Sequence, residues 1–97
     1  SSLSSSAKIY IDQGASKALK SGKSLLPAGI IKITGSFKKG DNIVIVDNNN
    51  TDVARALSSF TSEEINKIKG LQSSQIENIL GYASKSEIVH KDDIVIL

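Results

Sequence analysis

The stretch KSGKSLLPAGIIKITGSF, residues 20–37, joins a predicted helix to a predicted strand and contains the most informative local pattern of the chain. Its Gly-Lys-Ser triplet at residues 22–24 is similar to the end of a phosphate-binding loop. That loop also requires a glycine five residues before its last glycine, and position 17 is a lysine. It further requires a strand before it and a helix after it, whereas Leu-Leu-Pro follows here. We therefore do not expect nucleotide binding at this triplet.

The residues before the triplet predict a strand and a short helix. Lys8–Asp12 alternate between polar and apolar side chains, which is typical of a half-buried strand. Gln13–Ser21 carry apolar residues at helical spacing, and Gly22 suits a left-handed cap at the helix end. Pro27 has no backbone N–H and ends any continuation of that helix.

A series of strands and turns is predicted after Pro27. The order is strand 30–37, turn 38–41, strand 42–47, asparagine turn 48–50 and strand 52–60. In the first of these strands, Ile31 and Ile33 are expected on one face, with Lys32 and Thr34 on the other.

Two helices are expected next, and each has a predicted start and stop. Thr61 with Glu64, and Ser74 with Glu77, both fit the capping box, in which each side chain satisfies the other residue's free N–H. A glycine closes each helix, at positions 70 and 81. The side chains expected to face inward are Ile65, Ile68, Ile76, Ile79 and Leu80.

Short strands at 87–90 and 93–97 complete the predicted order of elements. Strands without regular strand–helix alternation argue against a doubly wound fold. The fold class is therefore mixed α/β and mainly antiparallel, a sheet or barrel with short helices packed outside it.

Composition limits what the chain can be. Its 97 residues suffice for one domain, and 39% hydrophobic with 23% charged residues is ordinary for a soluble globular protein. The absence of cysteine excludes disulfides, thiolate zinc sites and a cysteine nucleophile. No apolar run approaches the roughly 18 residues of a membrane helix, so no membrane partner is expected. Because the chain lacks methionine, we interpret it as a domain of a longer protein, with residues 1–7 as linker.

Positive charge gathers in the first part of the sequence. Residues 1–40 hold seven lysines and one aspartate, although the formal net charge of the whole chain is +2. Lys17, Lys20 and Lys23 follow one another at intervals of three, with Ser24 next to them and Lys32 on the following strand. They could contact a phosphate backbone, or they could be a solvated helix face. No aromatic residue is interleaved with them, so base stacking is not indicated.

Other polar clusters do not form a catalytic pattern. His90 with Asp92 and Asp93 lacks a second histidine, and we expect a structural histidine near a strand end rather than a metal ligand or a triad member. Glu63 and Glu64 are adjacent and point differently on a helix, so they make a poor acid–base pair. We therefore expect a noncatalytic module with no bound cofactor or metal.

Five segments together carry a resemblance to a known family. They are DQGASKALKSGKSLLPAGI, GSFKKGD, VARALSSFTSEE, IKGLQSSQIENILGY and EIVHKDDIVIL. In this order they resemble the PUA domain found at the C-terminus of glutamate 5-kinases, over residues 8–97. The motif residues with an expected structural role are Gly14, Gly22, Pro27, Gly29, Gly35, Gly40 and Asp41. The sequence departs from the family at Ala56, Phe60 and Lys91, and the lysine lacks the bidentate pairing of the usual arginine.

The resemblance implies a pseudo-barrel of about six strands with helices at its ends. PUA domains of RNA-modifying enzymes bind structured RNA through the first helix, the following loop and the second strand. Those segments correspond here to residues 13–21, 22–29 and 30–36, which include Lys17, Lys20, Lys23, Ser24 and Lys32. In glutamate kinases the domain is thought to tune activity and feedback inhibition.

The resemblance also implies a parent enzyme. It would be a cytoplasmic homo-oligomer that phosphorylates L-glutamate with ATP and Mg²⁺ in proline synthesis, and its upstream amino-acid kinase domain would hold the catalytic residues. Three roles remain open for this chain: a regulatory domain, an RNA-binding module, or a docking surface for the kinase subunits. Leu25, Leu26 and residues 94–97 are the candidates for such docking if they are exposed.

Overall fold

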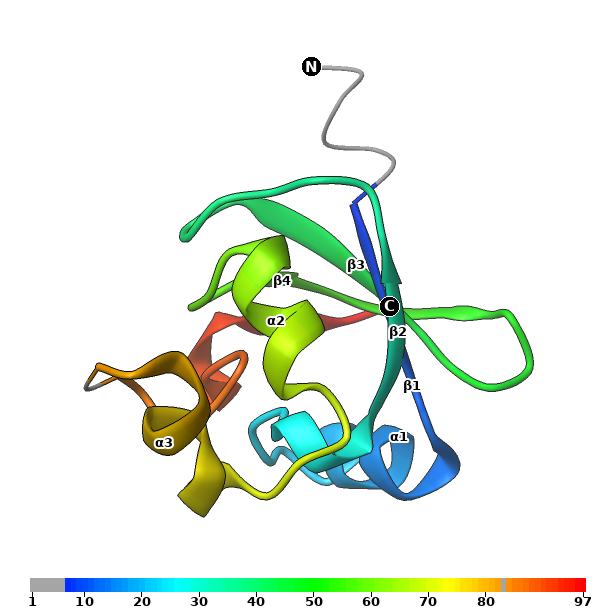
Figure 1. Cartoon of the computed structure of the whole chain (residues 1–97). Coiled ribbons are helices and arrows are strands. Elements are labelled where there is room, and N and C mark those ends of the chain that lie inside the picture. The colour runs from blue at the N-terminus through cyan, green and yellow to red at the C-terminus, as the bar shows by residue number, and fades with distance from the viewer. Residues whose placement is uncertain (1–6, 83) are drawn as a thin grey trace.

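One twisted sheet organises the molecule in the computed structural model, which describes residues 7–82 and 84–97 (Figure 1). The strands are β1 (Lys8–Ile11), β2 (Ile30–Thr34), β3 (Asn42–Val46), β4 (Asp52–Leu57) and β5 (Ile94–Ile96). The α-helices are α1 (Gln13–Lys20), α2 (Ser62–Ile68) and α3 (Ile76–Leu80). The 3₁₀ turns are η2 (Pro27–Gly29), η3 (Ser73–Gln75) and η4 (Lys91–Asp93).

The sheet has the strand order β2-β1-β3-β4-β5 and is mainly antiparallel. The pair β1 and β3 is parallel, and the other neighbours are antiparallel. This confirms the predicted fold class, although the pseudo-barrel is not closed, because β2 and β5 remain as edges. Of the predicted strand 87–90, Val89 forms an isolated bridge with Leu25 in place of a strand.

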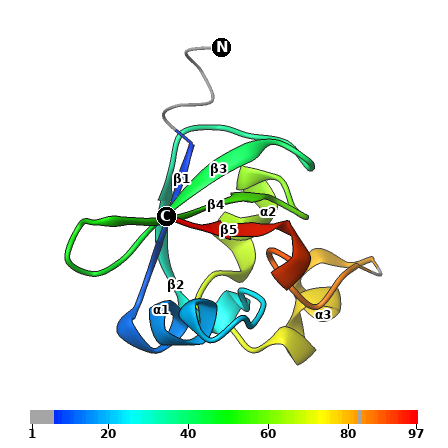
Figure 2. The same ribbon diagram turned by 180° about the vertical axis from the view of Figure 1, so that it is seen from behind.

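The core lies between the sheet and the helices α2 and α3. Ile9 and Ile45 point inward from neighbouring strands and are fully buried. Ile65 of α2 and Ile76 of α3 pack in the same buried cluster. Figure 1 shows α2 in front of β4, and Figure 2, from behind, shows β4 and β5 in front of α2, so the helix covers one face of the sheet.

The N-terminal boundary differs from the prediction at one residue. Of the predicted linker, residues 1–6 lie outside the described part of the structure. Ala7 is 1% exposed, belongs to the core, and accepts a hydrogen bond from the N–H of Val44. Ala7 therefore belongs to the packed domain and not to the linker.

A β-bulge changes the predicted faces of β2. Ile11 pairs with Ile30 and Tyr10 pairs with Lys32, so Ile31 is an extra residue in the register. Ile30 is buried and Ile33 packs against the core, but Ile31 is 53% exposed. Simple alternation was therefore wrong for Ile31, because a bulge shifts the period of two by one residue.

The predicted second capping box was also wrong. The segment Ser73–Gln75 forms the turn η3, and α3 begins after Gln75 with no side-chain cap. Ile79, expected to face inward, is 47% exposed, while Ile76 is buried and Leu80 is half-buried. Gly81 ends α3 in the left-handed conformation, as predicted. Within residues 7–82 and 84–97, no helix is long and apolar enough to cross a membrane.

Candidate nucleic-acid interface

Helix α1 is fixed at both ends by residues visible in the sequence. The carboxylate of Asp12 caps its start by accepting a hydrogen bond from the N–H of Ala15 at 2.8 Å. At its end Gly22 adopts φ +85°, and the N–H groups of Gly22 and Lys23 bond back to Leu19 and Ala18. This is a Schellman motif, and it turns the chain sharply after Lys20 and positions Lys23 beyond the helix.

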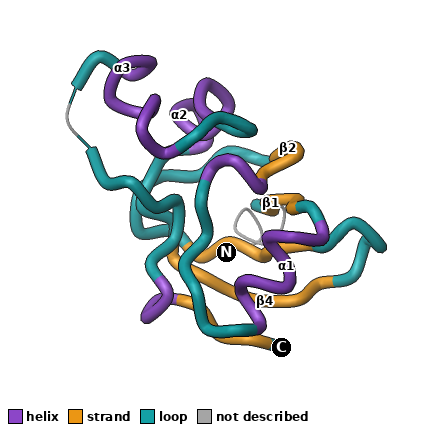
Figure 3. Tube along the Cα trace, turned by 90° about the horizontal axis from the view of Figure 1, so that it is seen from below, coloured by secondary structure: helices purple, strands orange, loops and turns teal. Residues whose placement is uncertain are grey.

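The loop after α1 is held by the last part of the chain. Leu25 is 1% exposed and exchanges backbone hydrogen bonds with Ile88 and Val89. The hydroxyl of Ser24 accepts a hydrogen bond from the N–H of Lys91 at 2.8 Å. Figure 1 shows α1, this loop and the start of β2 together at the bottom of the molecule, the side that faces the viewer in Figure 3. The predicted contact segments 13–21, 22–29 and 30–36 therefore adjoin one another.

Gly29 packs against the first turn of α1. A Cβ at this position would lie 2.5 Å from the Cβ of Ala15, so a larger residue would force the two segments apart. The carbonyl of Gly29 accepts a hydrogen bond from the N–H of Asp12. Pro27, buried at the start of η2, accepts one from the N–H of Gly70. The glycine and the proline thus join α1, η2 and the end of α2.

An open groove of about 470 Å³ lies between α1 and η2. Its lining is mostly apolar and comprises Asp12, Gly14, Ala15, Ala18, Lys23, Ser24, Leu25, Leu26, Ala28, Gly29 and Glu87. Lys23 contributes the cation of this lining, and Asp12 and Glu87 contribute carboxylates. The groove therefore suits a ligand with apolar surface better than a bare phosphate.

The structure brings together some of the predicted contact residues and not others. Lys17, Lys20 and Lys23 are exposed along α1 and just beyond it. Lys32 instead lies on β2 with its ammonium 4.6 Å from the centroid of the Tyr10 ring, a cation–π contact between paired residues. Lys91 joins this end of the molecule through its bond to Ser24. The RNA-contact role of these residues stays a prediction.

Glu87 lines the groove, although the sequence did not predict a position for it there. It comes from a segment more than sixty positions after Lys23, and the bridge between Leu25 and Val89 brings it to the groove. No local signal in the sequence marks such a contact.

Three of the remaining motif residues, Gly35, Gly40 and Asp41, shape turns outside the groove lining. Gly35 and Gly40 have φ of +76° and +85°, which favour glycine. Asp41 accepts a hydrogen bond from the N–H of Lys38 at 2.9 Å and closes the turn before β3. Gly14 lines the groove without a left-handed backbone.

His90 caps a 3₁₀ turn, which agrees with a structural histidine. Its Nδ1 accepts a hydrogen bond from the N–H of Asp92 at 3.1 Å and lies 3.5 Å from the Asp92 carboxylate. Among the described residues, no group of three or more histidine, cysteine or acidic side chains could hold a metal ion.

Glu64 has a structural environment rather than an acid–base partner. It completes the predicted capping box with Thr61 and accepts a hydrogen bond from the hydroxyl of Tyr82. Burial raises the pKa of Glu64, but the bonds from Tyr82 and Thr61 and the charge of Lys39 together hold it below its ordinary value of 4.5. The bond to Glu64, with burial and the carboxylate charge, raises the pKa of Tyr82 above its ordinary value of 10.0.

Sequence comparison connects the chain to one enzyme family. It is 58% identical over 95 residues to the glutamate 5-kinase of Pelagibacter ubique, covering 98% of this chain and 26% of that protein. It is 46% identical over 93 residues to the glutamate 5-kinase of a Thermoanaerobacter species, covering 95% of this chain and 25% of that protein. The chain thus spans about a quarter of the length of these relatives.

Solved structures show the same fold. A PUA domain from Aeropyrum pernix K1, crystallised as a tartrate complex, matches 88% of this chain and 41% of its own length with a TM-score of 0.65 and 21% identity. A chain of an H/ACA ribonucleoprotein bound to a substrate RNA matches 61% of this chain and 19% of its own, with a TM-score of 0.58 and 30% identity. The family model described as "PUA domain" matches residues 7–80. The chain therefore belongs to the PUA domain family.

Proposed function

We propose that this chain is the noncatalytic, regulatory C-terminal domain of a glutamate 5-kinase. The observation that carries the proposal is the identity of up to 58% across nearly the whole chain to proteins about four times as long. The longer protein would phosphorylate L-glutamate with ATP and Mg²⁺ in proline synthesis. An upstream amino-acid kinase domain would supply every catalytic group.

The geometry of the groove supports a binding role rather than a chemical one. The Asp12 carboxylate caps α1 and the Ser24 hydroxyl holds Lys91, so both polar groups already have structural partners. Loop 22–29 is fixed through Leu25 to Val89, which gives the surface a defined shape. A fixed, mostly apolar groove can transmit a contact with another surface to the rest of the domain.

The test is removal of residues 8–97 from the full-length protein. Glutamate phosphorylation is measured against glutamate concentration, with and without proline as the feedback inhibitor. We expect the turnover number to persist and the half-saturating or half-inhibiting concentration to change at least about fivefold, the low end of common coupling energies. Absence of kinase activity in the full-length protein, or unchanged kinetics after deletion, would reject the proposal.

Binding of structured RNA is a second candidate function. It is favoured by the exposed side chains of Lys17, Lys20 and Lys23 on and just beyond α1, and by the hydrogen bond that holds the backbone of Lys91 at Ser24, next to Lys23. Further support comes from the likeness to a ribonucleoprotein chain solved with a substrate RNA. Recognition would use helix shape, through contacts to phosphate and 2′-OH groups.

Fluorescence anisotropy with a labelled stem-loop RNA and with tRNA tests this second function. A Lys17/Lys20/Lys23→Glu variant is compared with a Lys38/Lys67/Lys85→Glu variant of equal charge change, since all six side chains are exposed. We expect the first variant alone to lose binding and to lower the slope of log K against log salt by roughly 2–3. Equal losses in both variants would indicate nonspecific attraction by net charge.

A further inference from the structure

The strand register aligns one row of side chains across the whole sheet. Lys8 of β1 pairs with Thr34 of β2 and with Val44 of β3, Val44 pairs with Arg55 of β4, and Arg55 pairs with Val95 of β5. Paired residues point to the same side of a sheet, so these five side chains form a continuous row, which we call the outer row. It spans roughly 19 Å, since neighbouring strands lie about 4.8 Å apart.

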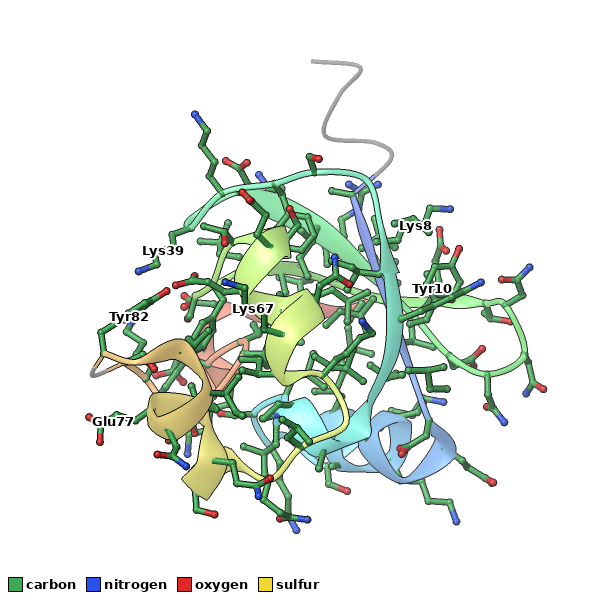
Figure 4. All side chains as sticks on the ribbon, in the orientation of Figure 1. Lys8, Tyr10, Lys39, Lys67, Glu77 and Tyr82 are labelled. Carbon is green, nitrogen blue, oxygen red and sulfur yellow. The ribbon has the colours of Figure 1, made fainter. Side chains whose placement is uncertain are left out.

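The outer row lies on the side of the sheet opposite α2. The side chains of α2 pack with Ile43 and Ile45, which alternate with Val44 along β3 and face the core. Figure 2 shows β3, β4 and β5 from behind with no helix in front of them. In Figure 4, Lys8 and Tyr10 extend on one side of the molecule, away from Lys39 and Tyr82.

Exposed apolar groups accompany the row along β4 and β5. Val95 is 65% exposed, Leu97 beyond the end of β5 is 62% exposed, and Leu57 of β4 is 39% exposed. By contrast, Leu25, one of the docking candidates from the sequence, is buried. Aliphatic side chains gathered on an uncovered sheet face are typical of a surface that contacts another protein.

The charge of the row is of one sign. Lys8 and Arg55 belong to it, and the row contains no carboxylate. Within residues 7–82 and 84–97, neither cation lies within ion-pair distance of an acidic side chain. An opposing surface that carries carboxylates would satisfy both cations and cover the aliphatic groups between and beside them.

The same features argue against two other occupants. In a pairing of two copies through the outer row, Lys8 and Arg55 would face a row that carries the same two cations and no carboxylate. A single-stranded nucleic acid would need a free aromatic ring for stacking, and the nearby ring of Tyr10 is in contact with the ammonium of Lys32.

We propose that the outer row is the docking surface for an acidic face of the preceding kinase portion of the same protein. This rests on the proposed function. Relatives are about four times as long as this chain, and Lys8 is both a member of the row and the first residue of β1. A domain that precedes β1 is thereby tethered beside this face, where its effective concentration is high.

The test measures cysteine accessibility in the full-length protein, with native cysteines outside this chain replaced. Val95→Cys and Ile79→Cys are labelled separately with a maleimide, because Ile79 of α3 is 47% exposed and lies outside the sheet. We expect the Val95→Cys variant to react with the maleimide about tenfold more slowly than the Ile79→Cys variant. A tenfold ratio corresponds to a free energy of docking of ~1.4 kcal/mol. Adding Arg55→Glu is expected to remove this protection, and adding the matched Lys67→Glu is not.

Similar labelling rates at both positions, or protection that Arg55→Glu leaves intact, would overturn the proposal. Protection of the Val95→Cys variant that appears only when RNA is added would overturn it too and assign the row to nucleic acid. Glutamate phosphorylation is measured on the unlabelled protein. Its absence would reject the proposed function, while the labelling ratio would still decide whether the preceding part of the chain covers the row.

Discussion

Helices α2 and α3 begin with the same kind of sequence pattern, but the pattern forms a capping box in α2 alone. At α2, Glu64 is 9% exposed and also accepts the hydrogen bond from Tyr82, so tertiary structure reinforces the local box. At α3, Glu77 is exposed, and the preceding residues turn as η3. In this chain the capping pattern forms a box at the helix whose acidic residue also has a partner outside its own helix.

The largest expected difference concerns the isoleucines of the two helices. Ile65→Ala in α2 removes a fully buried side chain and should lower the free energy of unfolding by about 2–5 kcal/mol. Ile79→Ala in α3 should change it by less than about 0.5 kcal/mol, because the side chain is 47% exposed. Urea unfolding of both variants checks this, and equal losses would mean that α3 packs more deeply than described.

Substitutions at the two helix starts should differ in their effect on the free energy of unfolding by less than the two isoleucine substitutions do. Thr61→Ala removes the hydroxyl that accepts from the N–H of Glu64 and should cost about 1 kcal/mol. Ser74→Ala should cost close to nothing, since Ser74 does not cap α3. Unfolding measurements should also find Thr61→Ser nearly neutral, because serine keeps the hydroxyl. A comparable loss for Ser74→Ala would show that its capping box forms in solution.

Acid should weaken the interactions of Glu64 at the start of α2. The pKa of Glu64 is lowered in the folded state. Its contribution to the free energy of unfolding is therefore present above pH 4.5 and is lost as the pH falls through the lowered pKa. Glu64→Gln should therefore be less stable than the wild type at pH 7, by less than the Thr61→Ala effect, and the difference should shrink towards pH 3. A difference that is constant between pH 7 and pH 3 would contradict the lowered pKa.

The smallest effect is expected at high pH. Because the pKa of Tyr82 is raised in the folded state, its contribution to the free energy of unfolding is present below pH 10.0. That contribution is lost as the pH rises through the raised pKa. Ultraviolet titration of the wild type and of Tyr82→Phe isolates this ring, since the chain has two tyrosines. Glu64→Gln should bring the Tyr82 transition closer to 10.0, and an unchanged transition would show that Glu64 does not cause the shift.

Elements marked by local chemistry were predictable from the sequence. Gly22 and Gly81 end their helices in the left-handed conformation, and Thr61 with Glu64 starts α2. The bulge at Ile31 was not predictable, because a strand pattern carries no sign of which residue its partner will skip. The strand predicted at 93–97 forms as the short edge strand β5, whereas the loss of the strand at 87–90 depends on the bridge to Leu25, far away in the sequence.

The candidate interface was predictable only where its residues follow from local sequence patterns. Lys17, Lys20 and Lys23 follow from helical spacing, and their exposure agrees with it. Long-range pairing, by contrast, sets the position of Lys32 over Tyr10. It also brings Glu87 and Lys91 next to the loop after α1. The outer row also depends on register across all five strands, which no local pattern specifies.

The bonds from Leu25 to Val89 and from Ser24 to Lys91 have a consequence for synthesis of the chain. Strands β1 to β4 and the row of lysines on α1 leave the ribosome first, and they can pair while the end of the chain is still being made. The loop that shapes the groove, however, cannot take its final form until residues 88–91 have emerged. Among the segments described here, the candidate interface is therefore one of the last features of the domain to be completed.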